Sequence, residues 1–436
     1  MIYDIGIMGG GPAGYTAALE AVAYGLSVIL FEKADIGGTC LNKGCIPTRH
    51  LEQVAASLHE LKADSRRGIH VEAMHFEFGE AHAEQQAIIR KLQESLTELL
   101  QAQKIVLCRQ EAKLVSSGMV DAAGIAYACR NILVATGSRP RQVLHPQALN
   151  SDEFLLLDKL PTKLAILGGG VTAVEFADSF AAMGVEVTMY LRGPRILRHF
   201  DVDLARGVQQ LLRQHGVQVQ TKCDIGTLNF STDTTILSAN GRIPNIHADF
   251  VEESLVALGE DGGILVDEHG ETKTKGIFAA GDVVSGSHQL AHTAMEEAKR
   301  IIRYIATGEV NTFRPVVSQC LYLTPEIATT GLTEAGAKAA GLSVVCAKQG
   351  MYANACTLIS TGERGFIKVL AERATGKILG AQLLCERASD LIVEFALAID
   401  RGLTVAEFAS TTHPHPTFAE AITDALVVLK RKLAIR

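Results

Sequence analysis

Two cysteines in a glycine-rich segment are the residues whose types and spacing most directly suggest chemistry. Cys40 and Cys45 lie five positions apart in GGTCLNKGCIPTRH, after Gly37 and Gly38 and before Pro47. Such a pair could be two inert thiols, two metal ligands, or a disulfide that opens and closes. Structural zinc sites usually take four ligands, and the sequence has no second close cysteine pair, so we expect no metal. A thiol near a helix start has a favoured thiolate, and both redox cycling and inert thiols stay open.

A second group of residues, the glycines of two matching segments, predicts binding of phosphate groups. YDIGIMGGGPAGYTAALEAVAYGLSVILFEK and LAILGGGVTAVEFADSFAAMGVEVTMYLR each read as strand, glycine-rich turn, helix and strand. In each copy one glycine permits a tight turn, a second lets the backbone approach a pyrophosphate, and a third small residue lets helix and strand pack. These residues are Gly9, Gly11 and Gly14 in the first copy, and Gly168, Gly170 and Ala173 in the second.

A shorter repeat follows each copy. ILVATGSRP, which contains Thr136 and Gly137, and ILSANGRIP, which contains Gly241, both read as a strand that ends in a tight turn. Two signals in the same order indicate an internal duplication. The chain is therefore predicted to be an α/β protein with two Rossmann-like dinucleotide-binding domains in series.

The two copies differ where an adenosine ribose would bind. Glu32 ends the second strand of the first copy, where a carboxylate can accept hydrogen bonds from a ribose 2′-hydroxyl. The second copy has Leu191 at the same offset, and Arg192 and Arg198 follow it. Arginine side chains bind a 2′-phosphate that an acid would repel. We expect an unphosphorylated adenosine in the first site and NADPH in the second, unless the arginines only form a solvated surface cluster.

Composition limits the class of protein and its partners. A chain of 436 residues predicts two or three domains, and its 47% hydrophobic and 20% charged residues are typical of a soluble globular protein. No apolar stretch is long enough to span a membrane, and the first residues lack the pattern of a secretory signal. The cytoplasm is therefore the expected location. The net charge of −7 gives no reason to expect nucleic acid or an anionic membrane as a partner.

Together these segments resemble the class I pyridine nucleotide-disulfide oxidoreductases, or flavoprotein disulfide reductases, and within them dihydrolipoamide dehydrogenase most closely. GGTCLNKGCIPTR is similar to the redox-active disulfide segment of that family, and ATGSRP and GIFAAGDV are similar to two signatures of its FAD domain. GGGVTAVE is similar to its nicotinamide dinucleotide motif, and segments that begin at Tyr322 and Gly365 are similar to its dimerisation domain. The resemblance implies an FAD domain, an NAD(P) domain and a C-terminal α+β dimerisation domain.

The resemblance also implies roles for individual residues. Cys45 would be the thiol next to the flavin, Cys40 the thiol that exchanges with the substrate, and Asp282 the acid that binds the ribitol chain of FAD. His415, in the segment HPHPTFAE, would be an acid–base group contributed by the second subunit, with Glu420 orienting it.

The implied function is two-electron transfer between a nicotinamide, a non-covalent FAD, the cysteine pair and a dithiol/disulfide substrate. Dihydrolipoamide and lipoamide are the leading substrate couple, a lipoyl-bearing protein is a candidate partner, and the enzyme is expected to be a homodimer. The alternatives are an NADPH-dependent reductase of another small disulfide, a metal ion or a quinone, and a flavin-bearing redox sensor.

The sequence also departs from the family pattern. Arg49 stands where the family usually has a lysine near the flavin, and we expect it to pair with Glu175. The stretch 218–236 is shorter than usual, and the chain lacks the terminal cysteine pair of mercuric reductases and large thioredoxin reductases. The expected domains are 1–148 with 264–311 for FAD, 149–263 for NAD(P), and 312–436 for dimerisation.

Overall fold

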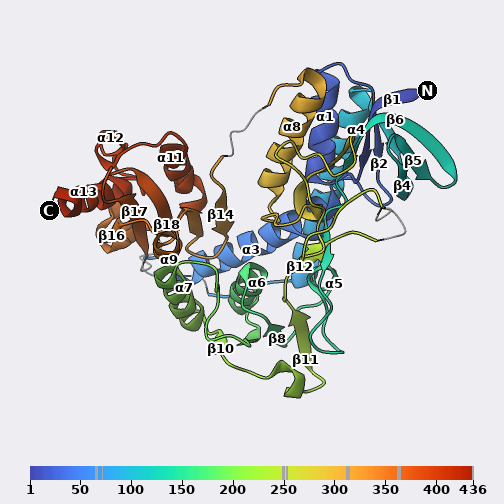
Figure 1. The fold of residues 1–436 in the computed structure, drawn as a ribbon. Coiled ribbons are helices and arrows are strands. Elements are labelled where there is room, and N and C mark those ends of the chain that lie inside the picture. The colour runs from blue at the N-terminus through green and yellow to red at the C-terminus, as the bar shows by residue number, and fades with distance from the viewer. Residues whose placement is uncertain are drawn as a thin grey trace.

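The computed structural model describes residues 1–63, 67–70, 72–247, 251, 254–310, 315–360 and 365–434. Two sheets made largely of parallel strands lie on one side of the molecule, and an antiparallel sheet near the C-terminus lies on the other (Figure 1). This arrangement confirms the predicted fold class of two Rossmann-like domains followed by an α+β domain.

The first sheet carries the first glycine motif. Its strand order is β3–β2–β1–β6–β5–β4, and β13 pairs with β6. The parallel strands are β1 (Ile2–Met8), β2 (Val28–Phe31), β3 (Val106–Cys108), β6 (Ile125–Val134) and β13 (Ile277–Ala279), and β4 (Ala112–Ser116) and β5 (Met119–Ala122) form an antiparallel ribbon on β6. The helices of this part are α1 (Pro12–Ala23), α4 (Phe78–Ala102) and α8 (Ala291–Thr307). Because β13 comes from a much later segment, the chain leaves this sheet and returns to it.

The second sheet repeats the strand order of the first. Its four strands are all parallel, in the order β10–β9–β8–β11. They are β8 (Lys163–Leu167), β9 (Glu186–Tyr190), β10 (Gln218–Gln220) and β11 (Thr234–Ser238), with helices α6 (Val171–Ala182) and α7 (Val202–Gln214). In both sheets the glycine motif follows the strand that lies third in this order, which is the position expected for a dinucleotide-binding unit.

The two short repeats pair with each other. β7 (Ser138–Pro140) and β12 (Arg242–Pro244) form an antiparallel two-stranded sheet in which Arg242 faces Pro140 and Pro244 faces Ser138. The short helix α5 (Ser151–Phe154) begins nearby with Asn150 as its N-cap. The paired turns therefore join the end of the first sheet to the end of the second.

The C-terminal part is a five-stranded antiparallel sheet with helices against it. The strand order is β14–β15–β18–β17–β16. The strands are β14 (Ser318–Leu321), β15 (Ile327–Gly331), β16 (Val344–Gly350), β17 (Phe366–Glu372) and β18 (Ile378–Leu384), and the helices are α9 (Glu334–Ala339), α10 (Ala355–Ile359), α11 (Ala388–Asp400), α12 (Val405–Phe408) and α13 (Glu420–Ala434). Buried apolar side chains of the sheet, α11 and α13 form one core. The domain boundary expected at 311 lies outside the described residues.

Two consecutive helices, α2 (Gly38–Lys43) and α3 (Cys45–Ala63), connect these parts. In Figure 1 α3 crosses the centre of the molecule. Leu51 and Leu58 of α3 belong to the same buried cluster as Phe176 and Phe180 of α6, so α3 packs on the second nucleotide-binding unit. Burial of these large apolar side chains fixes the position of the cysteine segment at the start of α3.

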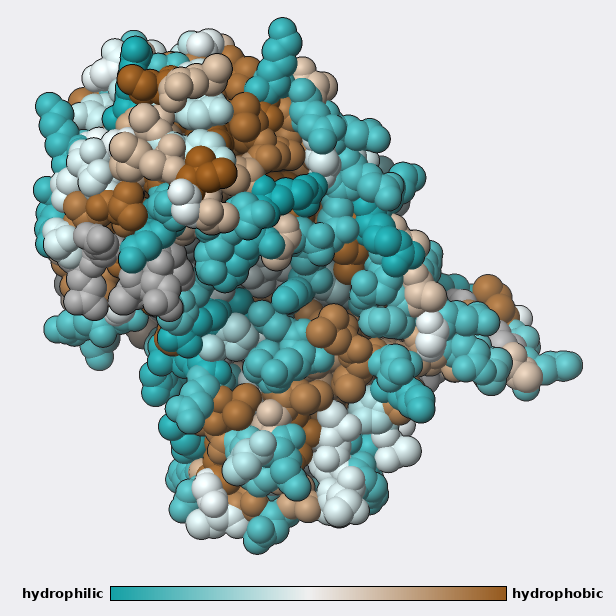
Figure 2. All heavy atoms as spheres, turned by 90° about the vertical axis from the view of Figure 1, so that its right-hand side faces the viewer, coloured by the Kyte–Doolittle hydropathy of each residue, from teal (hydrophilic) through white to brown (hydrophobic). Residues whose placement is uncertain are grey.

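No helix within the described residues is long and apolar enough to cross a membrane. On the face drawn in Figure 2, hydrophilic residues predominate and hydrophobic residues form separate patches.

Candidate active site

The cysteine pair lies where α2 gives way to α3. Cys40 belongs to α2, and Cys45 is the first residue of α3. Gly44 separates the helices, and a Cβ there would lie 3.0 Å from the carbonyl oxygen of Thr39, which is tighter than an ordinary contact. Both cysteines are free thiols in this structure, and their side chains are hydrogen-bonded to each other.

The contact makes the two thiols chemically unequal. The hydrogen bond to Cys45 and burial raise the pKa of Cys40 above its usual range. The hydrogen bond from Cys40 lowers the pKa of Cys45, assisted by the backbone N–H of Cys45 and the charge of Arg242. Since Cys45 begins a 19-residue helix, the helix dipole also favours a negative charge at this position. The arrangement therefore favours the thiolate form at Cys45 and the protonated form at Cys40.

A series of side-chain hydrogen bonds runs from the paired turns to Asp282, beside the thiols. The side chain of Ser138 donates to Asp282 (Oγ to Oδ2, 2.7 Å), and Arg242 donates to Ser138 (Nε to Oγ, 2.9 Å). The charge of Asp282 contributes to raising the pKa of both thiols, so its carboxylate lies close to them. Asp282 follows β13, and the return of the chain to the first sheet thus places it at the cysteine pair.

Thr136 and Gly137 lie in the turn between β6 and β7, and their hydrogen bonds tie this turn to the segment that follows β12. The Thr136 hydroxyl donates to the carbonyl oxygen of Asn245 at 2.9 Å, and the Asn245 N–H donates to the carbonyl oxygen of Gly137 at 2.8 Å. Gly241, in the matching turn of the second repeat, has φ +95°. The structure therefore shows a backbone role for these residues, and their contact with a cofactor stays a prediction.

The glycine motifs are built alike in the two units. Gly9 has φ +108°, and a Cβ on it would lie 2.3 Å from the carbonyl oxygen of Ala135. Gly168 has φ +143°, and a Cβ there would lie 2.3 Å from the carbonyl oxygen of Ala239. A Cβ on Gly14 would lie 1.8 Å from the carbonyl oxygen of Gly9. Any side chain at these positions would push apart the strand, turn and helix.

The same loops leave room for a pyrophosphate. Gly170 has no atom within 4 Å of an added Cβ, and the nearest atom to one on Gly11 is the Cα of Gly38 at 3.7 Å. Gly11 and Gly170 are the N-caps of α1 and α6, and neither helix start has a side-chain cap. The first backbone N–H groups can thus donate to phosphate oxygens. The carboxylate of Glu32 lies at the same loop, where it accepts from the N–H of Gly10 at 2.8 Å. These residues fit the diphosphate and ribose of FAD.

Arg49 does not make the ion pair that the sequence suggested. Its guanidinium lies 3.6 Å from Glu52 and 3.5 Å from Glu326, and 4.1 Å from the ring centroid of Tyr322. Glu175 instead accepts a hydrogen bond from the backbone N–H of Tyr322 at 3.3 Å. Among the ion pairs of the described residues, none joins Arg49 to Glu175. Glu52 lies three residues further along α3, on the same face as Arg49, and therefore competes for the guanidinium.

Glu52 and Glu175 form a buried acidic pair next to the cysteines. Burial and the charge of Glu175 raise the pKa of Glu52 to about 9. Burial and the charge of Cys45 raise the pKa of Glu175 to about 8. Arg49 opposes both shifts without cancelling them. At neutral pH these carboxyl groups therefore favour their protonated forms. Glu52 was not singled out from the sequence, although its i, i+3 spacing from Arg49 was a usable signal.

His415 and Glu420 contact each other in the C-terminal domain. The Nδ1 atom of His415 lies 2.7 Å from Oε1 of Glu420, and the N–H of Thr417 donates to Oε2 at 2.9 Å. The bond to His415 lowers the pKa of Glu420. The imidazole is 78% exposed in the single chain. One chain thus orients the histidine, and among the described residues no hydrogen bond joins His415 to Cys40 or Cys45.

The arginines expected at the second nucleotide site lie in the loop after β9. Leu191 is buried, whereas Arg192 and Arg198 are exposed. Arg195 donates to three carbonyl oxygens of the same loop, including that of Arg198 at 2.8 Å. Arg195 therefore shapes the loop and leaves the other two guanidinium groups facing solvent.

Comparison with known proteins follows the same division of the chain. The family described as pyridine nucleotide-disulphide oxidoreductase matches residues 3–298, and the dimerisation domain of that family matches residues 317–426. A dihydrolipoyl dehydrogenase from Bacillus subtilis is 31% identical over 99% of this chain and 98% of its own length. A dihydrolipoyl dehydrogenase from Geobacillus stearothermophilus is 31% identical over 97% of this chain and 95% of its own length.

Two solved structures share the whole fold. LpdA from Mycobacterium tuberculosis is 27% identical and superposes with a TM-score of 0.88 over 98% of this chain and 99% of its own. The HOCl-induced flavoprotein disulfide reductase RclA from Escherichia coli, in a Cu(II) complex, is 25% identical, with a TM-score of 0.87 over 98% of this chain and 100% of its own.

Proposed function

This chain belongs to the pyridine nucleotide-disulphide oxidoreductase family and is an FAD-dependent oxidoreductase that uses a pyridine nucleotide, and on that basis we propose that it interconverts dihydrolipoamide and lipoamide. The observation that carries the proposal is the hydrogen-bonded pair of Cys40 and Cys45 with opposite pKa shifts. The similarity to dihydrolipoyl dehydrogenases over nearly the full chain supports the choice of substrate.

The proposed exchange step balances at the cysteine pair. A thiolate of the substrate attacks the Cys40 sulfur of the Cys40–Cys45 disulfide and releases Cys45 as a thiolate. The second substrate thiol then displaces Cys40 from the mixed disulfide, which leaves a substrate disulfide and a reduced pair. The substrate loses two electrons and two protons. The lowered pKa of Cys45 makes it the better leaving group, and the raised pKa of Cys40 favours the return of a proton to that sulfur.

The remaining residues are proposed to hold the cofactor and move the proton. When bound, FAD supplies the two-electron relay between the cysteine pair and a nicotinamide. The glycine loop of α1 and the carboxylate of Glu32 would hold its diphosphate and ribose, and Asp282 its ribitol chain. His415 of a second copy would accept the substrate proton, with Glu420 fixing the tautomer.

A homodimer is needed to complete such a site, and the C-terminal domain offers a surface for one. Val393 and Leu397 of α11 are 61% and 55% exposed and lie one turn apart. Tyr352, Leu358 and Ile359 of the same domain are 72%, 61% and 69% exposed. Large apolar side chains grouped in one domain favour burial against a partner. The match of residues 317–426 to a dimerisation domain supports a second copy of this chain as that partner.

A second candidate is an NADPH-dependent reductase of another small disulfide or of a metal ion. Arg192 and Arg198 favour it, because their exposed guanidinium groups suit a 2′-phosphate. The likeness to RclA, whose structure holds Cu(II), also supports it. Both candidates use the same cysteine pair and differ in the coenzyme and in the molecule that meets Cys40.

Parallel assays of the purified holoenzyme separate the candidates. Dihydrolipoamide is given with NAD⁺ and with NADP⁺, and NADPH is given with oxidised glutathione or Cu²⁺. The first proposal predicts the highest kcat/KM with dihydrolipoamide, and loss of that activity in Cys40→Ser. Turnover of Cu²⁺ or glutathione without turnover of dihydrolipoamide would refute it and favour the second candidate.

A further inference from the structure

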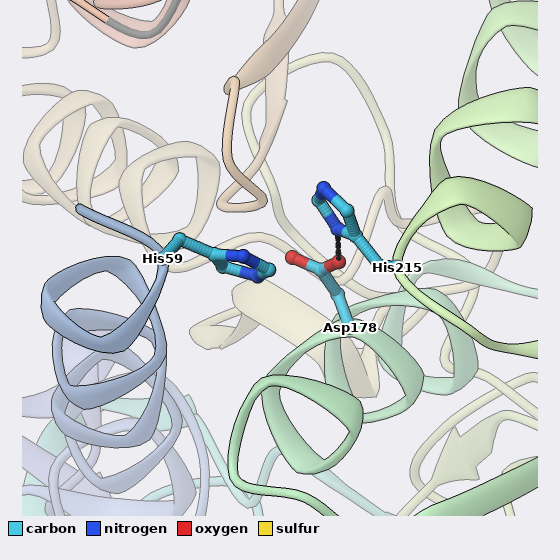
Figure 3. A group of neighbouring side chains, drawn as sticks. All are labelled: His59, Asp178 and His215. Carbon is cyan, nitrogen blue, oxygen red and sulfur yellow. Dashed lines mark hydrogen bonds and ion pairs between the residues drawn. The ribbon is translucent and has the colours of Figure 1, made fainter. Parts of the chain in front are cut away.

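Three potential metal ligands converge away from the cysteine pair. His59 belongs to α3, Asp178 to α6, and His215 is the residue that follows α7. One ligand atom from each side chain lies within 4.8 Å of the other two, and this is the one such group found in the described ranges. Figure 3 shows the Asp178 carboxylate between the two imidazole rings, which approach it from different helices. This cluster could not be predicted from the sequence, because its members are far apart in the chain.

The three side chains lie close enough together for one ion to take the place of their direct contact. The Nδ1 atom of His215 lies 2.6 Å from Oδ1 of Asp178, and the ring centroids of His59 and His215 are 4.2 Å apart. In a tetrahedral zinc site the donors lie about 2.0–2.2 Å from the metal, which puts them roughly 3.4 Å from one another. Metal binding would therefore replace the hydrogen bond between His215 and Asp178 and move the donor atoms by about 1 Å.

The charge and burial of the cluster favour a cation. The side chain of Asp178 is 3% exposed and that of His215 is 10% exposed, so the carboxylate is largely removed from water. The buried carboxylate supplies a negative charge and the two imidazole rings supply nitrogen donors, the ligand types that a divalent zinc ion binds. His215 also lies at the C-terminal end of the 13-residue helix α7, where the helix dipole is negative.

We propose that His59, Asp178 and His215 form a binding site for Zn²⁺ or a chemically similar divalent ion. Two imidazoles and one carboxylate are a usual zinc donor set, and a water molecule would complete the tetrahedron. Such a site differs from the expectation from the sequence that the chain binds no metal.

The metal would clamp the cysteine-bearing helix to the second nucleotide-binding unit. His59 and Cys45 lie on the same helix, fourteen residues or about 21 Å apart along its axis. Asp178 and His215 belong to the unit that carries the second glycine motif. Binding would thus restrain α3 against α6 and α7, in addition to the apolar packing of Leu58 with Phe180. This role is independent of which disulfide the enzyme reduces.

Zinc binding to the oxidised holoenzyme tests the proposal. Omission of reductant keeps the cysteine pair as a disulfide, so that it does not chelate the metal. Isothermal titration with ZnCl₂ and metal analysis after dialysis should give one tightly bound ion per subunit. His59→Gln leaves the hydrogen bond between Asp178 and His215 in place, and it should weaken binding at least tenfold. His215→Gln provides a second variant with the same expected loss.

His269→Asn is the matched control, because His269 is also a partly buried histidine that stacks on a ring, that of Tyr304, at 4.4 Å. It should bind zinc as the wild type does. Zinc should also raise the melting temperature of the wild type and of this control, but not of His59→Gln. Flavin content shows whether each variant is folded. Equal zinc binding by the wild type and both cluster variants, or no stoichiometric binding by the wild type, would overturn the proposal.

Discussion

The buried acidic pair next to Arg49 predicts an unusual effect of Glu52→Gln on stability. Glu52 is 4% exposed, and among the described residues neither of its carboxylate oxygens has a hydrogen-bond partner, although the Arg49 guanidinium lies 3.6 Å from one of them. Burial and the charge of Glu175 raise the pKa of Glu52 to about 9 from its ordinary 4.5. Glutamine has nearly the shape of the protonated acid and cannot ionise. The variant therefore removes the ionisation of this site and changes its packing little.

The sign and size of the effect follow from proton linkage. Between pH 4.5 and 9 the folded chain holds a proton on Glu52 that the unfolded chain releases, so wild-type stability falls as the pH rises through this range. Each unit of pKa difference corresponds to about 1.36 kcal/mol. The penalty is therefore close to zero at pH 4.5, about 3 kcal/mol at pH 7 and about 6 kcal/mol above pH 9. Glu52→Gln should abolish the pH dependence that Glu52 contributes to the free energy of unfolding.

Thermal unfolding of both holoenzymes from pH 5 to pH 9 measures the difference. The melting temperatures should agree near pH 5, and the variant should melt several degrees higher at pH 8. Glu98→Gln, which changes an exposed glutamate of α4, is the matched control and should follow the wild type at every pH. A Glu52→Gln curve that stays parallel to the wild-type curve, or lies below it at pH 8, would show that Glu52 is ionised in the folded protein.

Three further predictions concern the cofactor sites and the proton. Gly14→Ala places a methyl group 1.8 Å from a backbone carbonyl oxygen and should lose most of the bound FAD, measured as flavin absorbance per protein. Gly79→Ala is the control and should keep its FAD, because no atom lies within 4 Å of the added methyl group. Equal FAD retention by the two variants would contradict the steric argument. His415→Gln should lower dithiol turnover by about 10²–10⁴-fold. Flavin reduction by the nicotinamide, followed by stopped flow, should remain fast, and a slowed reduction would speak against a role limited to the thiol. Arg192→Ala with Arg198→Ala should raise the KM for NADPH about tenfold or more and leave that for NADH unchanged, whereas equal changes would exclude a 2′-phosphate contact.

The parts of the fold that could be predicted from sequence are those set by local steric demands. Gly9 and Gly168 are needed because each meets the carbonyl oxygen of an alanine, Ala135 or Ala239, in the short repeat that follows. The glycine motif and the short repeat meet in space in each unit, and the same order of these two signals in both halves of the sequence revealed the duplication. The contact between His415 and Glu420 was implied by the family resemblance, and it is close in sequence, because the two residues lie five positions apart.

Features that depend on the approach of distant segments could not be predicted. Glu326 reaches Arg49 from the C-terminal domain, and the N–H of Tyr322 takes the carboxylate of Glu175 that was expected to meet Arg49. The pairing of β7 with β12 also needs the two repeats to face each other, which neither repeat specifies alone. The partners of Arg49 and Glu175 follow from how α3 packs between the domains.

An anaerobic reductive titration of the oxidised holoenzyme tests whether Cys40 and Cys45 form an electron relay with the flavin. The wild type should accept four electrons per subunit, two for the disulfide and two for the flavin. After the first two electrons a long-wavelength charge-transfer absorbance should appear, since Cys45 is then a thiolate. Cys45→Ser should accept two electrons without that absorbance. A wild type that accepts only two electrons, or a Cys45→Ser variant that keeps the absorbance, would contradict the assignment of these two thiols.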